Sequence, residues 1–138
     1  MRVVICGSMA FAGKMLAVKQ SLEDKGHVCI TPIGTGEYAS GVRSSSGGSE
    51  GADRKIHGNL IKNYFAEIAR SDAILVLNYT KKGVANYIGG NTFLEMGFAH
   101  VLNRKIFLMN DIPDIFWCHE EILAMQPVVI NGDFAKII

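Results

Sequence analysis

Short runs of apolar residues alternate with amphipathic stretches along this chain of 138 residues. The apolar runs show no polar alternation, which is typical of strands buried on both faces of a sheet. They predict five strands, at residues 2–6, 27–31, 73–77, 105–109 and 128–130. Apolar residues that recur every three or four positions predict helices at about 11–25, 55–68, 91–102 and 120–125, and Asp133 is expected to cap a last helical turn.

The order of these elements predicts the fold. Buried strands that alternate with amphipathic helices are typical of a parallel sheet with helices on both faces. We therefore expect an α/β three-layer sandwich of the flavodoxin-like or Rossmann-like kind, with five parallel strands in the order 2-1-3-4-5. The length fits one domain, so residues 1–138 are predicted to form a single unit.

Two polar segments interrupt the regular pattern. Residues 33–53 contain six glycines and five serines and show no periodicity, which predicts a flexible Gly/Ser-rich loop. Residues 78–90 form a second polar loop after the third strand. Gly26 is expected to end the first helix, and Asn91 is expected to be the N-cap of the helix at 91–102.

Composition narrows the possible partners and surroundings. The 14 basic and 13 acidic residues nearly cancel, and no basic stripe is present, which argues against a nucleic-acid partner. No apolar stretch approaches the roughly 20 residues that a membrane span needs. Cys6, Cys29 and Cys118 lie far apart and lack metal-ligand spacing, so reduced thiols, a cytoplasmic location and no metal site are expected.

The fold predicts where a ligand would bind. In open parallel sheets, ligands bind beyond the carboxyl ends of the strands, where the strand order reverses. The segments at that edge are rich in Gly, Ser and Asn, whose backbone N–H groups can approach an anionic or hydroxylated ligand. Arg43 and Ser44 in the Gly/Ser-rich loop are candidates to bind a phosphate, if the ligand carries one. The candidate lining residues are Gly7, Ser8, Met9, Asn78, Gly90 and Asn91.

Glu95 is the candidate for chemistry. It lies near the start of the helix at 91–102, among residues that are otherwise apolar or glycine. A carboxylate is costly to bury without partners, so its presence there needs a reason. The residue is either stabilised structurally by the helix macrodipole or serves as a functional group that faces a ligand.

The segment from Ser71 to Met109 resembles the nucleoside 2-deoxyribosyltransferases and the related deoxynucleoside 5′-monophosphate N-glycosidases. Asp72 opens the third strand, and residues 95–99 (EMGFA) match the E-x-G-x-A core that carries the nucleophile of that family. Residues 6–8 (CGS) resemble the first substrate-binding loop. The resemblance covers about half of the chain.

The resemblance implies an activity. Glu95 would attack the anomeric carbon of a nucleoside or nucleotide and expel the base, and water or a second base would resolve the glycosyl ester. It implies neither a metal nor an organic cofactor. It also implies a homodimer or higher homo-oligomer whose sites borrow residues from a neighbour, for which the apolar residues of the loop at 112–117 are candidates.

The chain departs from the family pattern at two positions. Tyr64 stands where the family usually has an Asp on the second helix, and Gly89 stands where it has a polar residue. Both positions remain candidates for substrate binding. Two alternatives stay open: a non-catalytic nucleotide-binding or sensing module of the same fold, and a phosphoribohydrolase of the cytokinin-activating type, whose PGGxGTxxE loop residues 89–95 resemble.

Overall fold

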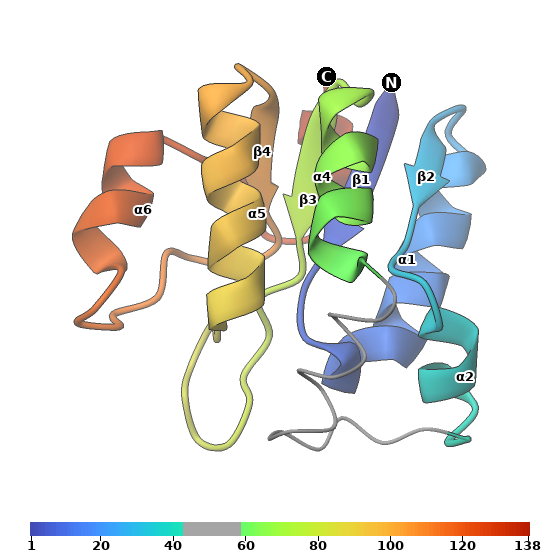
Figure 1. Cartoon of the computed structure of the whole chain (residues 1–138), viewed down its shortest axis with the longest axis horizontal. Helices are drawn as coiled ribbons and strands as arrows, with labels where there is room; N and C mark the ends of the chain where they lie inside the picture. Colours follow the sequence, from blue (N-terminus) through green and yellow to red (C-terminus); the bar gives the residue numbers. More distant parts are fainter. Residues whose placement is uncertain (43–58) are drawn as a thin grey trace.

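The structure is a computed structural model that describes residues 1–42 and 59–138. Its five strands form one parallel sheet in the order β2-β1-β3-β4-β5 (Figure 1). The predicted α/β three-layer fold and the predicted strand order are thus both confirmed. The strands are β1 (Arg2–Cys6), β2 (Val28–Ile30), β3 (Ala73–Val76), β4 (Lys105–Leu108) and β5 (Val128–Val129).

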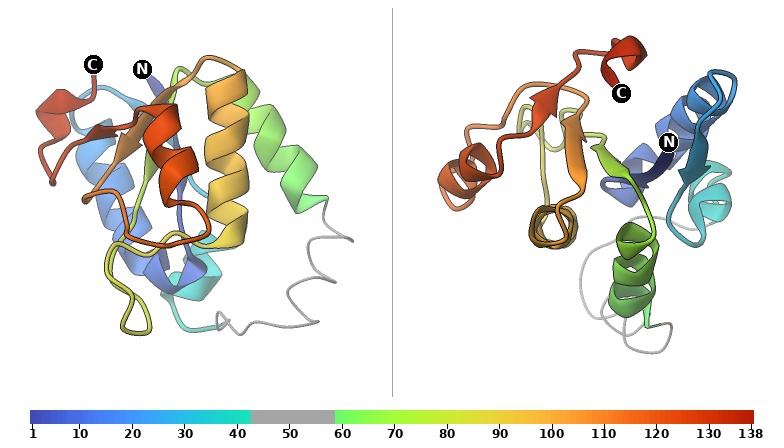
Figure 2. Two further views of the ribbon diagram at one scale, coloured as in Figure 1. Left: turned by 90° about the vertical axis from the view of Figure 1, so that its left-hand side faces the viewer. Right: turned by 90° about the horizontal axis from the view of Figure 1, so that it is seen from above.

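Helices cover both faces of the sheet (Figure 2). The helix α1 (Ala12–Glu23) and the 3-10 turn η2 (Phe134–Lys136) pack on one face. The helices α4 (Leu60–Ala69), α5 (Gly90–Val101) and α6 (His119–Met125) pack on the other. Asp133 caps η2 as expected, because its carboxylate accepts a hydrogen bond of 3.1 Å from the amide of Ala135.

The two hydrophobic clusters explain why the strands are apolar on both faces. Alternate residues of β1 point to opposite sides, so Val3 and Ile5 pack against α1 while Val4 and Cys6 pack under α4 and α5. All four of these side chains are fully buried. A central strand of a doubly covered sheet therefore has no position for a polar residue.

The prediction of a loop over residues 33–53 is partly wrong. Residues Thr35–Ala39 form a short helix, α2, which packs against α1. Gly34 adopts a left-handed φ of +85°, and the Thr35 hydroxyl donates to the Pro32 carbonyl, so the chain turns sharply after β2 and enters the helix. Residues 43–58 of the predicted loop lie outside the described part of the chain.

A glycine is required where β1 ends. Gly7 has a φ of +156°, and a Cβ at this position would lie 3.1 Å from the Leu77 carbonyl oxygen and 3.3 Å from Cε of Met15. The chain therefore passes close to the end of β3 before it enters the 3-10 turn η1 (Met9–Phe11), which leads directly into α1. This close approach brings the loop after β1, here called the first loop, beside the loop between β3 and α5.

Both termini lie at the edge opposite these loops (Figure 1). Among residues 1–42 and 59–138, no helix is both long and apolar enough to cross a membrane.

All three cysteines are buried and unpaired as disulfides, as the sequence predicts for reduced thiols. Burial, with a smaller contribution from Glu23, raises the pKa of Cys29 from 9.0 to about 11. Burial likewise raises the pKa of Cys118, with a smaller effect of Glu121. These thiols therefore keep their protons in the folded chain at pH values where the unfolded chain loses them.

We expect the free energy of unfolding to fall as the pH rises above about 9. Between the unfolded pKa and the folded pKa, the unfolded chain binds fewer protons, so stability decreases by up to about 1.4 kcal/mol per pH unit for each thiol. Urea denaturation at pH 8, 9 and 10 measures this slope. Cys29→Ala should give a shallower slope, and an equal slope in the variant would contradict the prediction.

Candidate functional site

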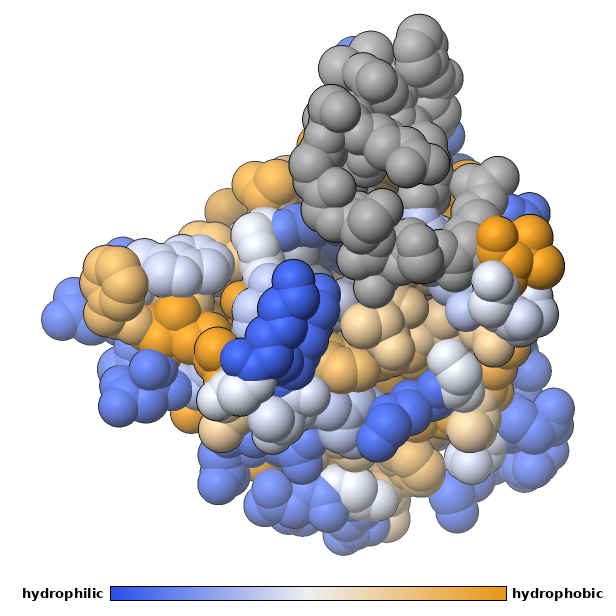
Figure 3. Space-filling view, turned by 90° about the horizontal axis from the view of Figure 1, so that it is seen from below, coloured by the Kyte–Doolittle hydropathy of each residue, from blue (hydrophilic) through white to orange (hydrophobic). Residues whose placement is uncertain are grey.

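A cavity of about 510 Å³ opens at the carboxyl edge of the sheet, where the predicted site lies. Figure 3 views the molecule from this edge, where hydrophilic side chains stand beside a band of hydrophobic ones. The walls come from the first loop, α2, α4, the β3–α5 loop and the start of α5. The predicted site residues that line it are Gly7, Ser8, Met9, Tyr64, Gly89, Gly90, Asn91 and Glu95.

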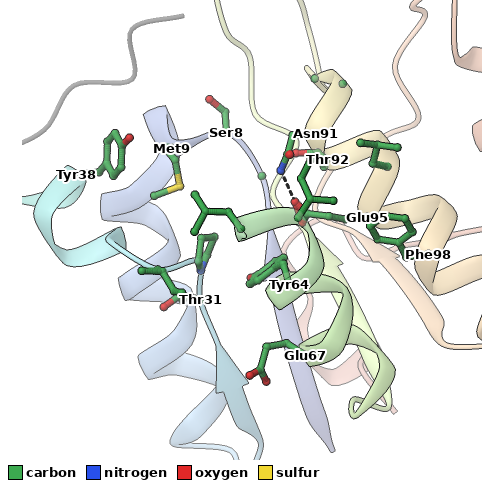
Figure 4. Close-up of a pocket in the computed structure, with 18 of the residues that line it drawn as sticks. Ser8, Met9, Thr31, Tyr38, Tyr64, Glu67, Asn91, Thr92, Glu95 and Phe98 are labelled. Atoms are coloured by element: carbon green, nitrogen blue, oxygen red, sulfur yellow. Dashed lines mark hydrogen bonds between the residues drawn. The ribbon is translucent and has the colours of Figure 1, made fainter. Parts of the chain in front are cut away.

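Glu95 is the sixth residue of α5 and faces this cavity, although only 5% of it is exposed (Figure 4). The amide Nδ2 of Asn91 donates a hydrogen bond of 2.7 Å to Oε1 of Glu95. The two residues lie four positions apart, so they occupy the same helix face. The carboxylate is thus held at the wall of the cavity in one orientation.

The prediction that Asn91 is the N-cap is wrong. The helix begins at Gly90, with Gly89 as its N-cap and no capping side chain. Asn91 consequently lies in the first turn, where its side chain reaches along the helix to Glu95 instead of back to the backbone. Because the N-cap lies two residues earlier than expected, Asn91 is a positioning residue for Glu95 rather than a structural cap.

Two further side chains surround the carboxylate. Cys6, at the end of β1, is buried beneath it, and its pKa is raised well above the ordinary thiol value by burial, then by the charge of Glu95 and a hydrogen bond with Glu95. The pKa of Tyr64 on α4 is also raised, first by burial and then by the charges of Cys6, Glu95 and Glu67. Both groups therefore stay protonated near neutral pH and surround Glu95 without adding charge.

The Tyr64 side chain comes from α4 and lies beside Glu95 (Figure 4). Its hydroxyl donates a hydrogen bond to the Ile5 carbonyl. Because the single hydroxyl proton is used there, the phenol oxygen presents lone pairs to its surroundings. Tyr64 can therefore accept a hydrogen bond from a ligand. The Asp that the resembled family usually has at this position would instead carry a charge.

Ser8 connects the first loop with the loop between β3 and α5. Its Oγ caps η1 by accepting from the amide of Ala10 at 3.2 Å, and it also accepts from Nζ of Lys81 at 2.8 Å. Both bonds use the oxygen as acceptor, so the hydroxyl proton can be donated to another group.

Asn78 does not line the cavity, so the sequence-based expectation for this residue is corrected. Its side chain is fully buried, and Nδ2 donates to the carbonyls of Asn110 and Asp111 at 3.1 and 2.9 Å. Its Oδ1 accepts from the amide of Asn110 at 2.9 Å. The residue ties the end of β3 to the chain after β4, because these backbone groups have left the ladder and need partners.

Other predicted residues lie elsewhere. Asp72 is at the amino edge of the sheet, where it accepts a hydrogen bond of 2.7 Å from the amide of Arg2. Arg43 and Ser44 lie outside the described residues. Trp117 makes an edge-to-face contact with Phe93, with ring centroids 5.6 Å apart, and does not line the cavity.

Several lining residues were not predicted from the sequence. Tyr38 comes from α2, which lies in the segment expected to be unstructured. Lys81 and Lys82 lie in the second polar loop, where the sequence drew attention to glycine and asparagine only. Glu67 lies on the same helix face as Tyr64, three residues further on, and that spacing would have indicated it.

In the described parts of the chain, no group of three or more His, Cys, Asp or Glu side chains is arranged to hold a metal ion. The polar groups of the described cavity lining include two carboxylates, of which Glu95 is buried, together with side-chain amides, hydroxyls and lysines. This set is suited to binding a polar organic ligand and to nucleophilic chemistry by the carboxylate.

The fold and the cavity define a class: a doubly wound α/β domain with one buried glutamate at the carboxyl edge of its sheet. Among solved structures, the chain is similar to the CMP N-glycosidase BcmB of Clostridium botulinum, with 16% identity, a TM-score of 0.45 and coverage of 78% of this chain and 70% of that one. A likeness this distant carries no argument about activity. No protein-family model and no curated protein matches the chain.

Proposed function

We propose that the chain cleaves or transfers the N-glycosidic bond of a nucleoside or nucleoside monophosphate, with Glu95 as the nucleophile. The observation that supports this is the position of the carboxylate. It faces a cavity of about 510 Å³ at the ligand-binding edge of the sheet, and Asn91 fixes its orientation. A cavity of this size is within the range that holds a ligand of nucleotide dimensions.

In the proposed reaction, an oxygen of Glu95 forms a bond to C1′ of the sugar while the bond from C1′ to the base nitrogen breaks. The electron pair of that bond leaves with the base, which takes up a proton from water. Water, or a second base, then attacks C1′ and releases the carboxylate.

A second candidate is a nucleotide-binding module without catalysis, and one observation favours it. The other carboxylate of the described cavity lining, Glu67, is paired with Arg2 at 2.5 Å and with Arg70 at 2.6 Å. Tyr64 already donates its proton to Ile5. Neither group is therefore placed to protonate a departing base, so slow or absent turnover is the expected behaviour of this alternative.

The two candidates differ in whether a base is released. Wild-type protein and Glu95→Ala are incubated with a panel of nucleosides and 5′-monophosphates, and free base is measured by chromatography. Release by the wild type alone supports the enzyme. A ligand-induced rise in melting temperature without release by either protein supports the binding module. Base release from a cytokinin nucleotide, with none from unmodified monophosphates, would identify the phosphoribohydrolase variant of the reaction.

We also propose that the chain forms at least a dimer. The outward faces of α4 and α5 and the loop before α6 carry exposed apolar side chains, some of which continue into the cavity wall. Large exposed apolar side chains gathered on neighbouring elements are typical of an interface. These residues are Ile61, Phe65, Leu94, Val101, Phe116 and Trp117.

Sedimentation equilibrium should therefore give at least twice the chain mass of 15.0 kDa. Leu94→Glu should shift the equilibrium toward the monomer because it places a charge in the proposed interface. A wild-type monomer at all concentrations would contradict the dimer.

A further inference from the structure

The loop between β3 and α5 contains a tight hairpin. Lys81 and Val84 form an antiparallel bridge, with backbone hydrogen bonds of 3.1 and 2.9 Å between them. Lys82 and Gly83 adopt left-handed φ values of +50° and +77°, as a two-residue type I′ turn requires. The hairpin therefore holds two consecutive lysines in a fixed arrangement at the cavity, where both contribute to the lining.

The Lys81 ammonium is anchored over the first loop. Its Nζ donates to Oγ of Ser8 at 2.8 Å and lies 5.0 Å from the centroid of the Tyr87 ring. The pKa of Lys81 is lowered, first by burial and then by the neighbouring charge of Lys82. A long side chain loses conformational entropy when it is held in this way, so the position is prepared before any ligand arrives.

Among the residues that the structure describes, the lysine charges at this part of the cavity are not balanced by carboxylates. Within the described residues, no ion pair joins Lys81 or Lys82 to an acidic side chain. The two acidic lining residues are engaged elsewhere, Glu67 with Arg2 and Arg70, and Glu95 with Asn91. Two adjacent ammonium groups and a serine hydroxyl with a proton to donate are complementary to an anion with several acceptor oxygens.

We propose that Lys81, Lys82 and Ser8 bind the phosphate of a nucleoside 5′-monophosphate, so that nucleotides rather than free nucleosides are the substrates. This inference rests on the proposed function. A phosphate monoester carries close to two negative charges at neutral pH and three acceptor oxygens, which match two ammonium groups and a hydroxyl. The N-terminus of α5, with no capping side chain at Gly89, borders the same cavity and adds to the positive potential.

Calorimetric titration with the full chain tests the assignment. The ligands are a nucleoside, its 5′-monophosphate, ribose 5-phosphate and inorganic phosphate. We expect the monophosphate to bind at least about tenfold more tightly than the nucleoside. Lys81→Gln and Lys82→Gln should each weaken monophosphate binding by about tenfold and leave nucleoside binding unchanged. Lys62→Gln on the exposed face of α4 is the matched control and should behave as wild type.

Each outcome separates the phosphate site from the chemistry. Equal affinities for nucleoside and monophosphate, or equal losses for both in the lysine variants, overturn the phosphate assignment. Tight monophosphate binding without base release overturns the proposed reaction and leaves the phosphate site standing. Base release that is equally fast from nucleosides supports the reaction and overturns the site. Equal affinity for inorganic phosphate and nucleotide would show an anion site that does not recognise nucleotides, and would also overturn it.

Discussion

Replacement of Glu95 by glutamine should reduce base release by at least about a thousandfold, as expected for the loss of a nucleophile. The glutamine side chain has nearly the same shape, and its carbonyl oxygen can still accept the hydrogen bond from Asn91. The fold and the cavity should therefore remain, while the neutral amide cannot form the ester with C1′. Chromatography of the released base, at saturating substrate, measures the effect.

The shorter variant Glu95→Ala provides a second measurement. Formate can occupy the space that the missing carboxylate leaves, so added formate should restore part of the activity of Glu95→Ala and none of the activity of Glu95→Gln. Glu120→Gln on α6 removes an exposed carboxylate far from the cavity lining and should release base at the wild-type rate. Activity of Glu95→Gln within tenfold of wild type would rule out Glu95 as the nucleophile.

Replacement of Asn78 by alanine should lower the free energy of unfolding by about 3 kcal/mol, because each buried partner left without a hydrogen bond costs roughly 1 to 3 kcal/mol. The variant removes the partners of two carbonyls and one amide at residues 110 and 111. The side chain is fully buried, so water cannot replace these bonds without a rearrangement. Urea denaturation measures the loss.

Gln20→Ala is the matched control for Asn78→Ala. It removes an exposed amide on α1 that bonds to Asp24 at 2.8 Å, and it should change stability by less than about 0.5 kcal/mol. Ligand affinity also separates the two roles of Asn78. If the role of Asn78 is structural, Asn78→Ala should bind nucleotides as wild type does when it is measured well below its unfolding temperature. A loss of affinity without a loss of stability would return Asn78 to the site.

The sequence by itself determined the sheet and its strand order. Apolar runs such as residues 73–77 are strands because no polar residue interrupts them, and a strand covered on both faces admits none. The sequence also placed Glu95 near the start of a helix at the carboxyl edge, since the element order fixes that edge. These inferences succeed because they depend on local periodicity and on the rules of parallel sheets alone.

Only the tertiary structure decided which polar groups meet. Asn78 was expected to line the cavity, yet its side chain binds the backbone after β4, more than thirty residues further along the chain. Lys81 reaches the loop after β1 because a two-residue turn folds the β3–α5 loop back on itself and because Gly7 lets the chain after β1 pass close to the end of β3. The partner of a buried amide or an anchored lysine lies tens of residues away, and its position depends on packing that no local pattern records.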